Sequence, residues 1–132
     1  RLTTKYEFNA ILKEEAASII QMNLGRVGGI LEAKKIASIA EASYAQVAPH
    51  MYCGPIIAAA NVQVATCISN FLIIEGIETW SGFDSSLVKD PLKWEAGYVI
   101  PSDKPGLGIE INEDKLDKYP YHEDKLHLEM SN

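Results

Sequence analysis

The chain has 132 residues, which is enough for one domain with its own hydrophobic core. Apolar residues make up 47% and charged residues 23% of the chain, a composition that excludes disordered, collagen-like and coiled-coil classes. Twelve Lys and Arg against eighteen Asp and Glu leave a net charge of −6, so the sequence predicts no nucleic-acid partner.

The cysteines and the apolar stretches indicate the compartment. Cys53 and Cys67 form no CxxC motif and have no clustered His to complete a zinc site, so we expect two reduced thiols. The longest apolar stretch, residues 55–65, is interrupted by Asn61 and Gln63 and is far shorter than the roughly 20 residues of a membrane helix. The charged N-terminus does not resemble a signal peptide. We therefore expect a cytoplasmic protein without a membrane segment.

Helical spacing and a capping pattern mark the first element. Apolar residues between positions 6 and 12 recur at helical spacing and predict a helix over residues 5–16. Thr4 is its expected N-cap, and Glu7 is the expected capping-box partner. The β-branched apolar run at residues 18–22 then predicts a buried strand.

Two further helix and strand pairs follow. Gly28 and Gly29 precede a helix predicted over residues 30–42, and a strand is predicted over 44–48. Pro55 suits the first turn of a helix that we expect to end near residue 68. The apolar run 71–74 predicts a third strand.

Beyond Gly76 the pattern weakens into loops rich in Ser, Asp, Pro and Gly. Short strands are predicted at residues 98–100 and 108–111, and a helical turn at 113–118. The polar tail, residues 119–132, is expected to be extended.

The alternation of apolar strands with amphipathic helices indicates the α/β class. Strands of this kind belong to parallel sheets that are covered on both faces. The pattern leaves two architectures open, a doubly wound open sheet and part of a (β/α)8 barrel.

A polar residue follows each predicted strand. Asn23, His50 and Glu75 are spaced 27 and 25 residues apart, about the length of one βα unit of a barrel. Because the carboxyl ends of parallel strands meet at one edge, an amide, an imidazole and a carboxylate are expected to line one pocket. Taken singly, each has a simpler interpretation: an Asx turn for Asn23, a core histidine for His50 and a solvated loop residue for Glu75. Their common register favours a site.

Several segments carry a resemblance to a known family: QMN at 21–23, GRVGGI at 25–30, APH at 48–50, GP at 54–55, Glu75 and KPGLGIE at 104–110. In order and spacing they resemble the last third of sugar-acid dehydratases, galactonate and gluconate dehydratases above all, in the mandelate racemase group of the enolase superfamily. The resemblance extends from residue 1 to about residue 117. It implies the C-terminal part of a modified TIM-type (β/α)7β barrel, about strands six to eight with their helices, over residues 1–76. Residues 77–132 would form a C-terminal extension that packs on the barrel and a capping domain.

The resemblance also implies roles for individual residues. His50 would be the general base or acid at the carbon next to the substrate carboxylate. Asn23 stands where the family has an aspartate that orients this histidine. Glu75 would hydrogen-bond the developing enediolate, and Glu75 and Trp80 would contact the substrate.

The implied reaction is the loss of water from a sugar acid. A proton next to a carboxylate is weakly acidic, so its removal needs a positioned base and stabilisation of the enediolate by Mg²⁺ and hydrogen-bond donors. Departure of the β-hydroxyl then yields an enol that becomes a 2-keto-3-deoxy acid. The family's Mg²⁺ ligands end strands three, four and five, and the last immediately precedes the residue matching Arg1, so we expect no metal ligand in this chain.

Two departures from the family pattern leave alternatives open. The chain starts just after the expected last metal ligand, so the remaining N-terminal part of the enzyme is the expected partner, as a separate segment, within a homo-oligomer. Asn23 can accept a hydrogen bond from the imidazole but cannot stabilise imidazolium by charge. The leading hypothesis is a Mg²⁺-dependent lyase. The alternatives are a truncated or degenerate barrel fragment without its own activity, and a racemase or epimerase of the same superfamily.

Overall fold

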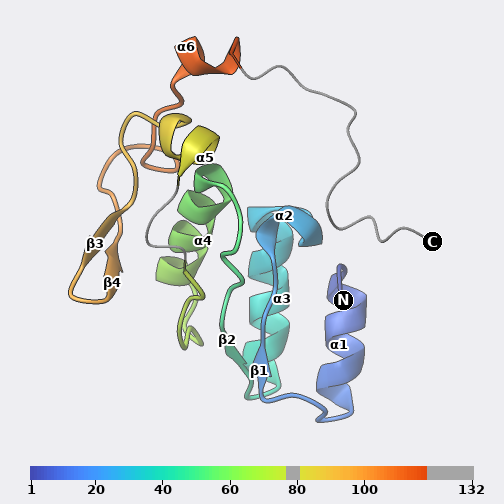
Figure 1. Ribbon diagram of the computed structural model, residues 1–132. Coiled ribbons are helices and arrows are strands. Elements are labelled where there is room, and N and C mark those ends of the chain that lie inside the picture. Colours follow the sequence, from blue (N-terminus) through green and yellow to red (C-terminus); the bar gives the residue numbers. More distant parts are fainter. Residues whose placement is uncertain (77–80, 119–132) are drawn as a thin grey trace.

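A computed structural model describes residues 1–76 and 81–118. In chain order its elements are α1 (Lys5–Lys13), β1 (Ile19–Ile20), α2 (Leu24–Val27), α3 (Ile30–Ala42), β2 (Gln46–Val47), α4 (Pro55–Cys67), α5 (Gly82–Ser86), β3 (Lys93–Glu95), β4 (Tyr98–Ile100) and α6 (Glu113–Leu116) (Figure 1). Figure 1 shows β1 and β2 side by side, with the longer helices α1, α3 and α4 packed along them. The hairpin β3–β4 and the short helices α5 and α6 follow beyond α4.

The first two strands are parallel, as the sequence predicts. Ile19 lies opposite Gln46 and Ile20 opposite Val47. Backbone hydrogen bonds extend this pairing beyond the named strands, from Gln46 N to Ser18 O (2.9 Å) at one end to His50 N and Met22 O (2.9 Å) at the other. The predicted strands over 18–22 and 44–48 are therefore confirmed in place, although their regular parts are shorter.

The third predicted strand, residues 71–74, forms only an isolated parallel bridge between Val47 and Phe71. Leu72 N donates to Val47 O (2.9 Å), and this bond places Phe71 opposite Val47. Further along, Glu75 N donates to Pro49 O (3.2 Å), and this bond places residue 74 opposite Pro49. Residues 71–74 thus lie opposite residues 47–49 and hold one residue more, as in a β-bulge. This extra residue interrupts the regular ladder.

Alternate residues of the paired segments face different surroundings. Ile20, Met22 and Val47 are at most 2% exposed and lie in the hydrophobic core with residues of α1, α3 and α4. Their neighbours Ile19 and Gln46 face the other way and are exposed. The helices therefore cover one face of the sheet within the part of the chain that the structure describes.

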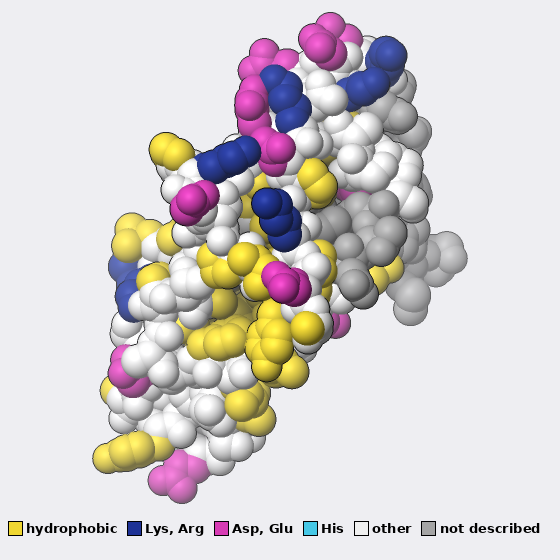
Figure 2. All heavy atoms as spheres, turned by 90° about the vertical axis from the view of Figure 1, so that its left-hand side faces the viewer, with side chains coloured by type: hydrophobic (Ala, Val, Ile, Leu, Met, Phe, Trp, Pro, Cys, Tyr) yellow, Lys and Arg dark blue, Asp and Glu magenta, His cyan; other side chains and the backbone are white. Residues whose placement is uncertain are grey.

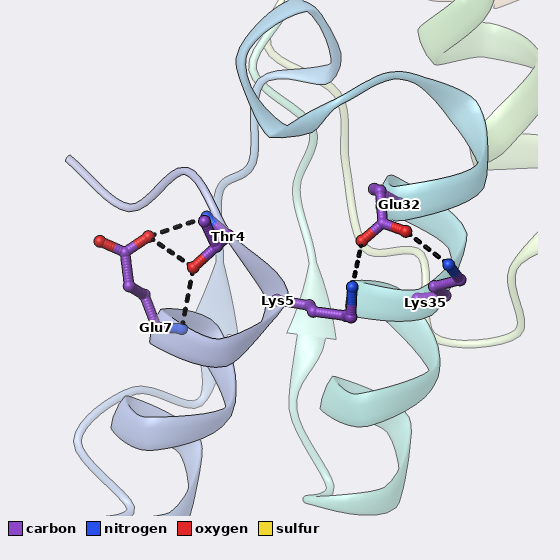
Figure 3. A network of polar contacts seen from close by, with 5 residues as sticks. All are labelled: Thr4, Lys5, Glu7, Glu32 and Lys35. Carbon is purple, nitrogen blue, oxygen red and sulfur yellow. Dashed lines mark hydrogen bonds and ion pairs between the residues drawn. The ribbon is translucent and has the colours of Figure 1, made fainter.

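The helix boundaries follow local signals closely. Thr4 and Glu7 form the predicted capping box, with Glu7 N donating to Thr4 Oγ1 (3.3 Å) and Thr4 N to Glu7 Oε2 (2.8 Å) (Figure 3). Helix α1 ends at Lys13 rather than at residue 16, because Glu15 takes a left-handed conformation (φ 52°). Helix α3 has the predicted bounds, and α4 ends one residue before the predicted residue 68. Lys5 pairs with Glu32 (2.8 Å) and so ties α1 to α3.

The segments after residue 80 are shorter and more exposed. The strand predicted at 98–100 is β4, which pairs antiparallel with β3. The positive φ angles of Ala96 (51°) and Gly97 (83°) form the tight turn between them. Residues 108–111 contribute only a bridge from Ile111 to Val88, and the predicted turn at 113–118 contains α6. The predicted extended tail, residues 119–132, lies outside the described residues.

One face of the molecule shows how polar and apolar side chains are distributed. Apolar side chains gather in the middle of this face, and basic side chains alternate with acidic ones above them (Figure 2). The pairs Lys104–Asp90 (2.6 Å) and Lys89–Glu110 belong to the segments after residue 80. Within the described residues, no helix is both long enough and apolar enough to cross a membrane.

Candidate catalytic site

Asn23 and His50 meet at the ends of the two parallel strands. The strands pair Ile19 with Gln46, an offset of 27 residues, and the same offset separates Asn23 from His50. The two side chains therefore lie next to each other, with Asn23 Nδ2 2.9 Å from His50 Nδ1. The contact that the strand-end pattern predicts is present.

The chemistry of this contact defines the histidine tautomer. When the amide NH2 group faces the ring, it can only donate, so His50 Nδ1 accepts and the neutral ring carries its proton on Nε2. An aspartate in place of Asn23 would instead accept from a protonated Nδ1 and leave Nε2 as a base. With the amide oriented in this way, His50 presents a proton donor to the site.

Glu75 completes the group through the bulge described above. Because of the extra residue, Glu75 falls beside His50 and not beside Met51. Its Oε2 lies 3.6 Å from His50 Nε2, too far for a hydrogen bond but within ion-pair distance of a protonated ring. The side chains of His50 and Glu75 are 34% and 45% exposed, so both are accessible from solvent.

Two residues that the sequence argument did not assign to the site belong to it. Gln21 Nε2 donates to Glu75 Oε2 (3.1 Å), and Arg26 lines the same cavity as His50. Gln21 could have been found, because it precedes Asn23 by two residues and so lies on the same face of the strand. Arg26 lies in the short helix α2, which the sequence pattern did not predict.

The cavity at this edge has a volume of about 210 Å³ and is lined by Arg1, Leu2, Gln21, Asn23, Arg26 and His50. Neither arginine forms an ion pair within the described part of the chain. Two guanidinium groups, neither of which has a carboxylate partner among the described residues, favour an anionic ligand in this cavity.

Other candidate groups contribute less. Burial, followed by the charges of Asp84 and Glu75, raises the pKa of the Cys53 thiol to about 11, so this thiol is protonated at neutral pH and is a poor nucleophile. Over residues 1–76 and 81–118, no three His, Cys, Asp or Glu side chains are grouped as metal ligands. Trp80, the predicted substrate contact, lies outside the described residues.

Comparison with known proteins identifies the family. A family model described as enolase C-terminal domain-like matches residues 1–115. The chain belongs to this family. It represents the C-terminal portion of a protein of the mandelate racemase/muconate lactonizing enzyme group, as the sequence motifs predict.

Individual relatives of this enolase-family chain give the scale of the similarity. D-galactonate dehydratase from Variovorax paradoxus is 36% identical over 122 residues, which are 88% of this chain and 32% of the relative. A structure from Burkholderia SAR-1, assigned to the mandelate racemase/muconate lactonizing enzymes, has a TM-score of 0.89 and 58% identity and covers 98% of this chain and 32% of its own. A candidate galactarate dehydratase from Agrobacterium radiobacter, solved with Na and L-malate, has a TM-score of 0.80 and 33% identity, over 91% of this chain and 34% of its own. The chain spans about a third of the length of these relatives.

Proposed function

We propose that the chain is the part of a sugar-acid dehydratase that supplies the Asn23–His50 pair and Glu75. In this proposal β1, β2 and the segment 71–74 are strands six to eight of a (β/α)7β barrel, and the substrate is of the galactonate or gluconate type. The observation that carries the proposal is the 2.9 Å contact of Asn23 with His50, beside Glu75, in a chain 36% identical to a D-galactonate dehydratase.

His50 moves a proton at Nε2 in this reaction. The substrate loses the proton next to its carboxylate and its β-hydroxyl, which leaves as water, and the resulting enol becomes the 2-keto-3-deoxy acid. With the Nε2 proton in place, His50 is suited to protonate the departing hydroxyl, and a base outside the described residues would take the proton next to the carboxylate. Rotation of the Asn23 amide by half a turn would place its oxygen on Nδ1 and make Nε2 the base.

Glu75 and the arginines account for binding of the acid. Gln21 holds one carboxylate oxygen of Glu75, so the other oxygen can accept a hydrogen bond from a substrate hydroxyl or the enediol. Arg26 and Arg1 supply positive charge to the same cavity. The family resemblance implies Mg²⁺, and in this proposal its ligands belong to other parts of the protein, since the described residues hold no group of three His, Cys, Asp or Glu side chains.

Exposed apolar side chains at the sheet support the proposal that another part of the same protein covers this surface. Ile19, Leu72 and Ile73 are 50%, 41% and 63% exposed, which is unusual for apolar strand residues. We propose that the remaining part of the same protein covers these side chains, and that the complete protein is a homo-oligomer.

The test uses the complete protein that contains this chain, purified with Mg²⁺ and offered a panel of aldonic and aldaric acids. Formation of a 2-keto-3-deoxy acid is measured, and His50→Ala is expected to lower kcat about 10³-fold. Lys13→Ala, an exposed change at the end of α1, is the control and should leave kcat unchanged. Absence of activity on every acid would overturn the proposal and favour a structural fragment without activity.

The same experiment separates the racemase or epimerase alternative. A racemase would exchange the proton next to the carboxylate with deuterium from the solvent without releasing a keto acid. Exchange without elimination would therefore replace the dehydratase proposal by this alternative.

A further inference from the structure

We propose that Asn61 is a positioning residue that holds the backbone of His50 through a hydrogen bond from helix α4. Asn61 lies in α4, is fully buried, and donates from Nδ2 to the backbone oxygen of His50 (3.1 Å). Asn61 is not among the described residues that line the cavity, and its hydrogen bond reaches the backbone of His50 and not the ring. Its influence on the reaction would therefore be exerted through the backbone.

This hydrogen bond completes the fixation of the His50 backbone. On one side, His50 N donates to Met22 O of the neighbouring strand segment (2.9 Å). On the other side, the carbonyl of His50 accepts from Asn61. The ring is held separately by Asn23. The residue that carries the proton is thus attached to β1 through its amide, to α4 through its carbonyl and to Asn23 through its side chain.

The local chain explains why such an anchor is needed. Helix α4 begins only at Pro55, and residues 51–54 between His50 and the helix form no helix or strand. Without Asn61, the His50 carbonyl would lose its connection to the helix. A small shift of the ring would then change its 2.9 Å contact with Asn23 and its 3.6 Å approach to Glu75. A displacement of a reacting group by about 1 Å can lower a rate by up to about 10²-fold.

The surroundings of Asn61 argue against a purely structural role. Among the described residues it is the one polar side chain in the buried class, and the neighbouring buried residues of α4 are apolar. Its Oδ1 atom is buried and has no hydrogen-bond partner among the described residues, which costs stability. A Leu at this position would avoid that cost. The amide is therefore best explained by what its Nδ2 holds, the carbonyl of His50.

Asn70 offers a matched control within the same chain. Its Nδ2 donates to the backbone oxygens of Ala37 (3.1 Å) and Ala45 (2.9 Å), and its Oδ1 is likewise buried without a partner among the described residues. It lies at the start of the third strand segment, at the opposite end of the sheet from His50. Loss of this amide should affect stability in the same way as loss of Asn61, without reaching the site.

The experiment compares Asn61→Leu with Asn70→Leu in the complete protein. Because the kinetic part rests on the proposed function, a second readout is independent of activity: the ring nitrogen resonances of His50 in protein labelled with ¹⁵N-histidine, assigned with His50→Ala. We expect Asn61→Leu to lower kcat about tenfold with little change in KM and to shift the His50 resonances. Asn70→Leu should do neither, and Asn61→Gln, which keeps an amide donor, should recover part of kcat.

Equal effects of the two Leu substitutions, or unchanged His50 resonances in folded Asn61→Leu, would overturn the proposal. If Asn61→Leu does not fold, Asn61→Ser serves instead, because its shorter side chain lacks the amide that donates to the His50 carbonyl. A wild-type protein without dehydratase activity would remove the proposed function but leave the resonance comparison decisive for Asn61.

Discussion

Residues 1–76 and 81–118 are organised by different physical means. In the first region, helices α1, α3 and α4 bury apolar side chains against β1 and β2, and most of the core residues lie here. In the second region, Leu87 and Val88 are the buried apolar side chains among the described residues. Its short elements rely instead on a tight hairpin turn and on surface ion pairs such as Lys104–Asp90.

The difference shows where precise geometry can be maintained. Surface ion pairs contribute little to stability, whereas a packed core resists small displacements. Asn23, His50 and Glu75 all belong to the first region. The second region approaches the site where Trp94 of β3 packs against Gly76, the residue after Glu75.

The largest expected effect tests the difference in packing directly. Ile36 in α3 is fully buried, and Ile36→Ala should lower the free energy of unfolding by about 2–5 kcal/mol because it leaves a cavity. Leu116→Ala in α6, where the side chain is 41% exposed, should cost far less. Urea unfolding of the complete protein measures both. Similar losses would mean that the second region has a core of comparable strength.

The contact between the two regions gives the next effect. A Cβ atom on Gly76 would lie 2.5 Å from Cη2 of Trp94, so Gly76→Ala should destabilise by about 1–3 kcal/mol through overpacking. Adding Trp94→Leu should recover part of the loss, because it removes the clashing ring. If the double variant is as unstable as Gly76→Ala alone, the clash is not the cause. Thermal unfolding monitors both variants.

The next prediction compares the same change of charge, Asn to Asp, at the site and in the second region. Asn23→Asp would let the carboxylate accept from Nδ1 of His50 and stabilise a charged ring, and should change kcat on the order of tenfold. We expect an increase if His50 acts as the base and a decrease if its Nε2 proton is needed for the departing hydroxyl. Asn112→Asp, at the N-cap of α6 in the second region, is the matched control. Equal kcat in all forms would mean that position 23 contributes orientation alone.

The smallest effect concerns the beginning of α1. Thr4→Ala removes the capping hydrogen bond and should cost about 1 kcal/mol, whereas Ser81→Ala in the second region should cost less because Ser81 makes no side-chain cap bond to α5. Hydrogen bonds from the backbone of Thr3 and from Thr4 lower the pKa of Glu7 below its ordinary 4.5. Its contribution is therefore present above pH 4.5 and is lost as the pH falls through the lowered pKa. The difference in stability between Thr4→Ala and wild type should therefore become smaller at low pH, where the bond from Thr4 Oγ1 to the Glu7 carboxylate is weakened, while the bond from Glu7 N to Thr4 Oγ1 still separates the two curves.

The sequence predicted the elements whose signals are local. Helix α3 has the predicted bounds because the glycine pair and the apolar spacing depend only on neighbouring residues. The capping box and the hairpin strand β4 were predicted for the same reason. The short elements α2, α5 and β3 were not predicted, because three to five residues carry too little periodicity to be distinguished from loops.

At the site, the sequence by itself determined which residues follow the strands and which family they resemble. The contact between Asn23 and His50 could be predicted from the sequence. The parallel strands pair residues that are 27 positions apart in the chain, and Asn23 and His50 are also 27 positions apart. The division at residue 76 and the contact of Trp80 with substrate stay predictions.

The tertiary structure alone decided how those residues face one another. The bulge in 71–74 turns Glu75 toward His50, Gln21 holds its carboxylate, and Asn61 reaches the His50 carbonyl from α4. Each of these contacts joins residues from different elements. Their geometry depends on the register of the sheet and on the packing of α4, and these result from the whole core and not from any local run of residues.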